Sequence, residues 1–301
     1  MVGGCQFQAK NSGSDMQWQL VYENNFNKDK GASDWVMEGP GEFEIGHGKM
    51  TMWPLAQKAM LAKWESAGRK TLDPKTEYYQ TIEKALKAQA YPKLETLYND
   101  KGTLNGGHIV LWNKKIKTQD DYAVEFDFKP LSPIGLAILF FSGNGGNGED
   151  LFDPTLKDRH GVFGSYIRGD INCYHISYWA NNAAVGKRGS CNLRKNHGFY
   201  NLANESDPSV AQLDYTQPKF TFTTHHIRLE KVANTITFYI NGQQVISYKD
   251  KQFNDTLGDN GGVQEANVDT GSYLKGGRIG LRQMTGLKAE YSNFKVYQLK
   301  K

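Results

Sequence analysis

Alternation of apolar and polar residues marks much of the chain and predicts β-strands. From Tyr122 to Phe128 every second residue is aromatic or valine, and the residues between them are alanine or charged. This pattern is typical of a half-buried antiparallel strand. Gly135–Gly143 is instead a continuous apolar run, which indicates a strand that is buried on both faces.

Turn signals between such segments predict hairpins. Gly41–Trp53 alternates on both sides of a glycine-containing turn. His225–Asp250 contains two alternating strands joined at Asn234, followed by a second turn at Asn241–Gly242, a dipeptide that favours tight hairpins. We therefore expect many short antiparallel strands.

One stretch breaks the β pattern. From Leu55 to about Asn99 the chain is rich in Ala, Lys, Glu and Leu, and apolar residues after Asp73 recur at helical spacing. Asp73 is a suitable N-cap, and Pro74 would occupy the first helical position, where proline is favoured. We expect a helical insertion at about residues 55–99, which forms a lid, a wall of a cleft or an interface.

Composition favours an all-β chain. The 16 Tyr, 15 Phe, 6 Trp and 32 Gly are typical of aromatic sandwich cores with long loops. Because neither a repeat nor a linker is evident, we expect a single domain over residues 16–301. The net charge of +4, from 36 basic and 32 acidic residues, is too small to indicate a nucleic-acid partner. No run approaches the roughly 20 apolar residues that span a bilayer.

The first residues point to a location. "MVGGC" is similar to the end of a bacterial lipoprotein signal, with Cys5 as the residue that receives the lipid. Residues 1–15 would then be a flexible tether on an extracytoplasmic protein, in the periplasm or at the cell surface. Membrane contact would be limited to that lipid anchor. The alternative is an incidental cysteine.

Several runs carry a family resemblance. "LWNKK", "LFFSGNGGNGEDLFDP", "GDINCYHISYW" and "CNLRKNHGF" resemble the YesU-like family, a domain of unknown function. The strand order that ends in "GRIGLRQ" and "YSNFKVYQL" resembles the concanavalin A-like jelly roll of lectins and glucanases. The resemblance covers most of the chain outside the helical insertion. It implies a sandwich of two antiparallel sheets, one of which binds glycans, and a role in breaking down acidic plant or algal polysaccharides.

The strand in "GDINCYHISYW" is the first candidate for the site. If the following loop is a simple hairpin centred near Val185, the return strand pairs Ile176 with Arg194 and His175 with Lys195, and cross-strand partners share a face. A register error of one residue would exchange these partners. Two constellations stay open: Asn172, Tyr174, Tyr178 and Arg194 on one face, and His175, Trp179, Lys195 and His197 on the other.

These residue types favour β-elimination from a uronic acid. A pair of close carboxylates, which a glycosidase requires, is missing from the strands. Arginine neutralises the substrate carboxylate and makes the neighbouring C–H more acidic, while histidine and tyrosine exchange protons. We predict a lyase or dehydratase for acidic polysaccharides or oligosaccharides, with His175 and Tyr178 as base and acid and Arg168 and Arg194 as carboxylate clamp. The predicted substrate-binding residues are Asn172, Tyr174, Trp112, Asn147, Glu149 and His197.

Two alternatives remain. A non-catalytic glycan-binding module would use the same aromatic and polar residues. A glycoside hydrolase would require Glu38, Glu149 and Asp153 to converge in space. We expect no required cofactor, although the loop Asn144–Asp153 carries oxygen ligands that suit either a structural calcium ion or sugar hydroxyls.

Overall fold

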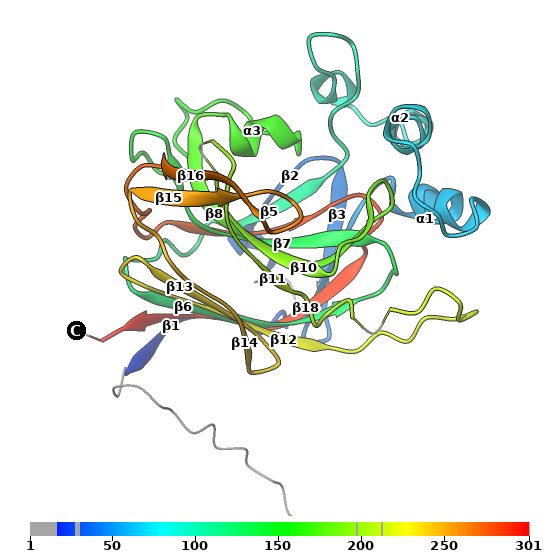
Figure 1. Ribbon diagram of the computed structural model, residues 1–301. Coiled ribbons are helices and arrows are strands. Elements are labelled where there is room, and N and C mark those ends of the chain that lie inside the picture. The colour runs from blue at the N-terminus through cyan, green and yellow to red at the C-terminus, as the bar shows by residue number, and fades with distance from the viewer. Residues whose placement is uncertain (1–16, 28–30, 197, 212, 301) are drawn as a thin grey trace, which may run out of the picture.

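The computed structural model describes residues 17–27, 31–196, 198–211 and 213–300 (Figure 1). The predicted tether, Cys5 and His197 lie outside the described residues. Two antiparallel sheets pack face to face and form the body of the fold (Figure 1). The predicted jelly-roll sandwich is therefore confirmed.

The first sheet runs in the order β14 (Gln243–Lys249), β13 (Thr235–Ile240), β12 (His225–Val232), β6 (Tyr122–Pro130), β18 (Ala289–Leu299), β4 (Lys49–Pro54) and β3 (Gly41–Gly46), with β1 (Trp18–Asn24) paired to β18. The second sheet runs in the order β11 (Tyr200–Ser206), β10 (Ser190–Asn196), β8 (Ile171–Asn182), β7 (Gly135–Gly145), β17 (Arg278–Gln283), β5 (Ile109–Asn113) and β2 (Trp35–Glu38), with β9 (Gly186–Lys187) paired to β8. A separate hairpin consists of β15 (Phe253–Leu257) and β16 (Val263–Asp269).

The core lies between the two sheets and follows the predicted alternation. The aromatic and valine face of β6 is fully buried there. Strand β7 is buried on both faces, as its apolar run predicts: Leu139 points to the core, and Ile138 and Phe140 point to the outer side of the second sheet. The hairpin turn at Asn241–Gly242 also forms where predicted, and both residues have positive φ angles, as a tight hairpin turn requires.

The helical insertion is confirmed. It contains α1 (Gln57–Ser66), the one-turn π-helix η2 (Pro74–Tyr78), α2 (Tyr79–Ala88) and the 3₁₀ helix η3 (Leu94–Leu97). Asp73 caps η2, since its side chain accepts hydrogen bonds from the backbone N–H groups of Lys75 and Thr76. Ile82 and Leu86 of α2 are buried in a second apolar cluster, which joins the insertion to Ile134 beside the second sheet.

Three excursions surround the outer face of the second sheet. The insertion, the short helix α3 (Phe163–Ile167) and the β15–β16 hairpin all lie on the side away from the first sheet (Figure 1). The remaining short helix, η1 (Ala32–Asp34), precedes β2. The outer face of the second sheet is therefore the floor of an enclosed region.

Candidate functional site

Strand register brings the candidate residues together on this outer face. His175 of β8 pairs with Arg194 of β10 on one side and with Phe140 of β7 on the other. In the neighbouring row Ser177 pairs with Ile138, which pairs with Arg282 of β17. Because cross-strand partners share a face, one side of the sheet carries a histidine and two arginines within a few strands.

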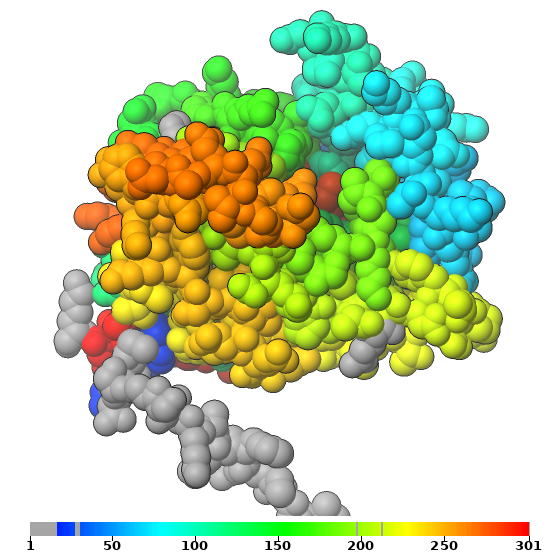
Figure 2. Space-filling model, in the orientation of Figure 1, coloured from blue at the N-terminus to red at the C-terminus, as the bar shows by residue number. Residues whose placement is uncertain are grey.

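A cavity of about 290 Å³ opens above these rows. Strands β7, β8, β10 and β17 provide its floor, and the insertion, α3, Phe199 and the turn after β8 provide its walls. Figure 2 shows the hollow between the cyan insertion, the yellow-green turn and the orange hairpin, with dark red atoms at its bottom. We call it the arginine cavity, and its polar and aromatic lining consists of Tyr78, Tyr79, Phe163, His175, Ser177, Asn182, Arg188, Arg194, Phe199 and Arg282.

The register corrects the prediction for this hairpin. Arg194 pairs with His175, whereas the simple loop had placed it opposite Ile176. The turn is centred on Ala184, since Asn182 pairs with Gly186. Between this pair and the pair Ser177–Asn192, the return strand contains one more residue than β8 does. This extra residue shifts the pairing by one position and moves Arg194 to the face of His175.

The two predicted tyrosines lie on the opposite face. Tyr178 is fully buried between the sheets, where its ring contacts Phe128 and Phe238. Tyr174 is also buried there, and its hydroxyl donates to Asp250. The catalytic role predicted for Tyr178 and the binding role predicted for Tyr174 are therefore wrong, because neither side chain reaches the cavity.

Other predicted residues lie outside the cavity. Arg168 is exposed just after α3, and Asn172 donates a hydrogen bond to the Gly146 carbonyl. Asn147 and Glu149 bond to each other at the exposed tip of their loop. Trp112 lies on the same outer face of the second sheet as the cavity, but it is fully buried and stacks on Phe140. The structure thus retains His175 and Arg194 from the predicted set.

The carboxylates of the acidic loop already have hydrogen-bond partners. The carboxylate of Glu149 accepts from the backbone N–H of Asn147, that of Asp153 from Thr155, and that of Asp150 from Arg278. Within the described ranges, no group of three His, Cys, Asp or Glu side chains is placed to hold a metal ion. The described part of this loop therefore does not bring three such side chains together around a calcium ion.

Glu38 and Asp153 border a different groove, and Glu149 does not. The carboxylate of Glu38 is occupied: it accepts from Arg159 Nη2 at 2.8 Å, from the Tyr166 hydroxyl at 2.8 Å and from the Trp112 indole at 3.0 Å. None of the three acids lines the arginine cavity. The convergence that a hydrolase would need is absent there.

Arg282 is the most unusual group in the site, and it is not among the residues predicted from the sequence. Its side chain is about 1% exposed and lies over the rings of Tyr166, Phe163 and Phe140 at 5.2, 5.5 and 5.9 Å. Its Nε and Nη2 atoms have no hydrogen-bond partner among the described residues. Burial lowers the pKa of the guanidinium, but arginine remains charged in proteins. A buried cation with free donors favours an anionic ligand.

The other two arginines have partners. Arg188 donates to the Ser177 hydroxyl at 2.5 Å, and Arg194 forms an ion pair with Asp259 at 2.7 Å. Arg194 also stacks on the Phe199 ring at 4.5 Å, and its Nε is buried without a partner. Among the described residues the cavity lining holds three guanidinium groups and no carboxylate, so the cavity is positively charged.

His175 is held neutral beside these cations. Burial lowers the pKa of its imidazole well below the usual value, and Arg194 and Arg282 lower it further. Its Nδ1 lies 3.0 Å from Asn196 Oδ1, and Asn196 Nδ2 donates to Cys173. In the tautomer in which Nδ1 donates to this oxygen, Nε2 is the basic nitrogen of a side chain that lines the cavity.

The insertion contributes two phenols to the wall. Tyr78 is 2% exposed, and its hydroxyl has no hydrogen-bond partner among the described residues. Tyr79 is half-buried beside it, and burial raises the pKa of both phenols, so that both are protonated at neutral pH. The insertion is therefore a wall of the cleft, one of the three roles predicted for it.

A sequence signal for Arg282 existed. In "RIGLRQ" the residues Arg278, Gly280 and Arg282 share one face of a short apolar strand. Gly280 has no side chain, and a Cβ there would lie 2.5 Å from the Trp112 ring. Two arginines on one face of a buried strand are unusual enough to mark a site.

Comparisons with known proteins agree with this fold. Residues 81–296 match the family described as DUF1961, a domain of unknown function. The chain is 35% identical over 192 residues to the uncharacterized protein YesU of Bacillus subtilis (strain 168). The aligned region covers 64% of this chain and 77% of that protein.

Solved structures are also similar. A protein of unknown function with a galectin-like fold from Bacillus subtilis superposes with a TM-score of 0.63 at 25% identity, covering 95% of this chain and 100% of that one. The carbohydrate recognition domain of Emp46p superposes with a TM-score of 0.49 at 12% identity, covering 95% of this chain and 100% of that one, an overlap too loose to bear on function.

No described helix has both the length and the apolar character needed to cross a membrane.

Proposed function

The chain belongs to the DUF1961 family, a domain of unknown function, and we propose that its arginine cavity binds the carboxylate of a uronic acid in an acidic glycan and promotes β-elimination there. The observation that carries this proposal is Arg282, a buried guanidinium with two unpartnered nitrogens at the cavity. A planar carboxylate matches the donor geometry of a guanidinium, and its charge offsets the desolvation of the arginine.

The cavity also suits a sugar in other respects. At about 290 Å³ it lies at the small end of ligand sites. Tyr79, Phe163 and Phe199 offer aromatic surface, and Ser177 and Asn182 offer hydrogen bonds to hydroxyl groups. This combination of flat rings, amide and hydroxyl groups and one anion-binding subsite fits a short acidic oligosaccharide.

Neutral His175 supports the chemical step. In a uronate the carbon next to the carboxylate carries a proton that becomes more acidic when an arginine neutralises the carboxylate. His175 Nε2 would remove this proton, the C–H electrons would form a C=C bond, and the C–O bond at the adjacent carbon would break. A Tyr78 or Tyr79 hydroxyl would protonate the departing oxygen. A sugar leaving group makes the protein a lyase, and a water leaving group makes it a dehydratase.

The charge of the substrate would tune this base. The arginines lower the pKa of His175 in the empty cavity, and a bound carboxylate offsets their charge. His175 would therefore become a stronger base when the acidic ligand is present. The electrons balance within the substrate, so the reaction requires no redox cofactor. A protein that acts on polysaccharide would also be expected outside the cytoplasm.

A glycan-binding module without catalysis is the second candidate. The galectin-like fold of the similar Bacillus subtilis structure is compatible with it. The same Arg282 contact would hold the ligand, and His175 would serve only as a hydrogen-bond donor or acceptor.

The test is the ultraviolet absorbance of the conjugated product formed from a panel of uronate glycans, combined with calorimetric binding. We expect absorbance to rise with the wild-type chain and to stop in His175→Ala, while the binding constant of this variant changes less than about tenfold. Binding without any absorbance change in the wild type would establish the binding module. If the wild type showed no binding and no absorbance change, both candidates would be rejected.

A further inference from the structure

A second groove of about 340 Å³ adjoins the arginine cavity. The two share Arg194 and Phe199, which stack on each other and form the threshold between them. The second groove, which we call the hairpin groove, lies between strands β10 and β11 and the β15–β16 hairpin. A ligand that enters the cavity past Arg194 would therefore also contact the hairpin groove.

The hairpin groove contains an unsatisfied buried acceptor. Asn201 of β11 pairs with Arg194 in the sheet and is about 5% exposed. Its Nδ2 donates to the Gly258 carbonyl at 3.3 Å, but its Oδ1 has no partner among the described residues. Arg194 Nε is likewise buried without a partner. These two groups, an acceptor and a donor at the threshold, suit the hydroxyl groups of a sugar.

The charge changes sign between the two spaces. Of the described residues, those that line the arginine cavity include three arginines and no carboxylate. Those that line the hairpin groove include Asp259 and Glu265, and their one arginine is the shared Arg194, which is already paired with Asp259. A carboxylate placed in the hairpin groove would face Glu265 and meet repulsion, while an uncharged sugar would not.

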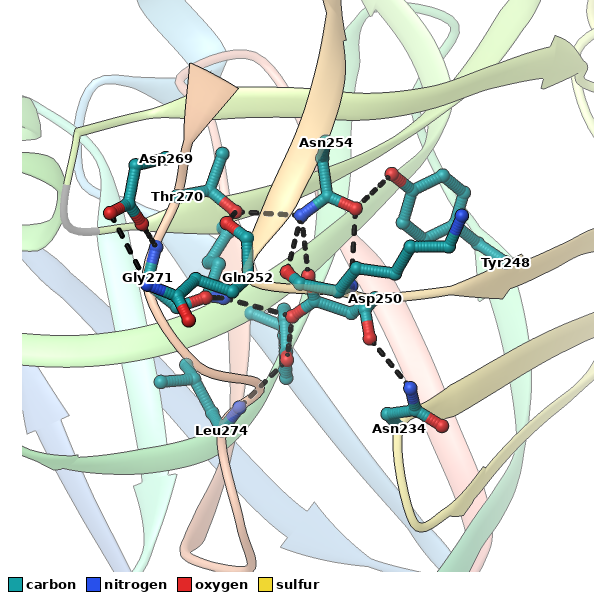
Figure 3. Close-up of polar contacts among 12 residues, drawn as sticks. Asn234, Tyr248, Asp250, Gln252, Asn254, Asp269, Thr270, Gly271 and Leu274 are labelled. Atoms are coloured by element: carbon teal, nitrogen blue, oxygen red, sulfur yellow. Dashed lines mark hydrogen bonds and ion pairs between the residues drawn. The ribbon is translucent and has the colours of Figure 1, made fainter. Parts of the chain in front are cut away.

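The wall that carries these acids is firmly anchored. Figure 3 shows the base of the hairpin, where Asn254 Nδ2 donates to Asp250 Oδ1 at 2.9 Å and to Thr270 Oγ1 at 2.7 Å. Tyr248 donates to Asn254 Oδ1 at 2.8 Å. Asp250 is fully buried and also pairs with Lys195 of β10 at 2.9 Å. The base of the hairpin is thus fixed against β10, and the hairpin holds its place as a wall of the groove.

We infer that the hairpin groove is a subsite for an uncharged sugar, so that the protein selects glycans in which a uronic acid is linked to a neutral residue over glycans made of consecutive uronic acids. This inference rests on the proposed binding of a uronate in the arginine cavity. The shared residues Arg194 and Phe199 place the two sugars next to each other, and the carboxylate of Glu265 repels a second carboxylate.

The experiment compares two oligosaccharides of equal length, one that alternates uronate with a neutral sugar and one made only of uronates. Affinities are measured by calorimetry in the wild type and in His175→Gln, in which turnover does not consume the ligand. We expect the alternating ligand to bind at least tenfold more tightly. Glu265→Gln should reduce this preference at least threefold, and Glu44→Gln, at an exposed position of β3 in the other sheet, should leave it unchanged.

Each outcome separates the two proposals. Equal affinity for both ligands, or a preference that Glu265→Gln leaves intact, would overturn the subsite and keep the uronate site. Failure of both ligands to bind would overturn the uronate site and the subsite together.

Discussion

Arg282 is a buried cation whose donors are only partly used. Three aromatic rings surround it, and its Nε and Nη2 lack partners in the described chain. Burying a charge without an ion partner costs stability, and proteins retain such groups at functional sites. We therefore expect Arg282 to lower the stability of the unliganded fold.

Replacing Arg282 by methionine should separate these two effects. Because Arg282→Met removes a buried charge and keeps the volume, we expect the free energy of unfolding to rise by about 1–2 kcal/mol, while affinity for a uronate ligand falls at least tenfold. Urea denaturation and calorimetry measure the two quantities. The control is Arg228→Met, which breaks ion pairs with Glu125 and Glu230 on the first sheet and should not stabilise the chain. A marked loss of stability in Arg282→Met would mean that the residue is structural.

His175 gives a prediction about pH. Its pKa is lowered in the folded chain, chiefly by burial, so the unfolded chain binds a proton more readily than the folded chain. The folded state therefore loses stability as pH falls below about 6.5, the ordinary histidine pKa. His175→Gln should lose less stability than the wild type between pH 7 and pH 5, measured by thermal denaturation. His108→Gln is the parallel variant, since burial lowers the pKa of His108 as well. Equal losses of stability between pH 7 and pH 5 in His175→Gln and in the wild type would contradict the lowered pKa of His175.

At the scale of elements, the turn after β8 decides which residues meet. Alternation along β8 correctly separates His175 from Tyr174 and Tyr178. The pairing with β10 was predicted one position away, because an extra residue in the return strand leaves no signature in the apolar pattern. That single residue decides whether Arg194 faces the cavity or the core. Sequence reasoning therefore found the strand and left its partners open.

The insertion illustrates a second limit. Its helical spacing and the Asp73 cap were readable, but its contact with the cavity depends on long-range packing. Tyr78 reaches the cavity because η2 sits against the second sheet. The local pattern could not assign it a role.

Tyr78 can be tested by removing one atom. Since its hydroxyl lacks a partner, Tyr78→Phe should change the free energy of unfolding by less than about 1 kcal/mol or raise it. If the phenol serves the ligand, turnover or affinity should fall about tenfold or more. Tyr98→Phe is the matched control, because the Tyr98 hydroxyl bonds to Glu83 within the insertion, away from the cavity. Wild-type activity and affinity in Tyr78→Phe would exclude it from the site.

At the scale of the whole molecule, the two faces of the second sheet have different tasks. The inner face packs the core and carries the buried cluster of Tyr174, Lys195 and Asp250, while the outer face carries the cavity. The all-β class, the insertion and several strands followed from alternation, turns and composition, because these patterns reflect burial directly, whereas the jelly-roll sandwich followed from the family resemblance. Arg282 was missed because its strand lies over 100 residues after His175, and only the sheet order joins them.

The buried cluster predicts a large effect on stability. Asp250→Ala leaves Lys195 buried without its carboxylate and frees the base of the hairpin, so we expect a loss of about 3–5 kcal/mol in the free energy of unfolding. Asp158→Ala, an exposed site, should stay within about 0.5 kcal/mol. Urea denaturation measures the free energy of unfolding of both variants. Similar values for the two would show that the buried cluster does not hold the hairpin in place.

The most direct measurement is calorimetric binding of an acidic oligosaccharide and of the same oligosaccharide with its carboxyl groups reduced to alcohols. The uronate site predicts that the wild type binds the acidic form at least tenfold more tightly, and that Arg282→Gln removes this difference. Equal affinity for the two forms in the wild type, or an undiminished preference for the acidic form in Arg282→Gln, would contradict it.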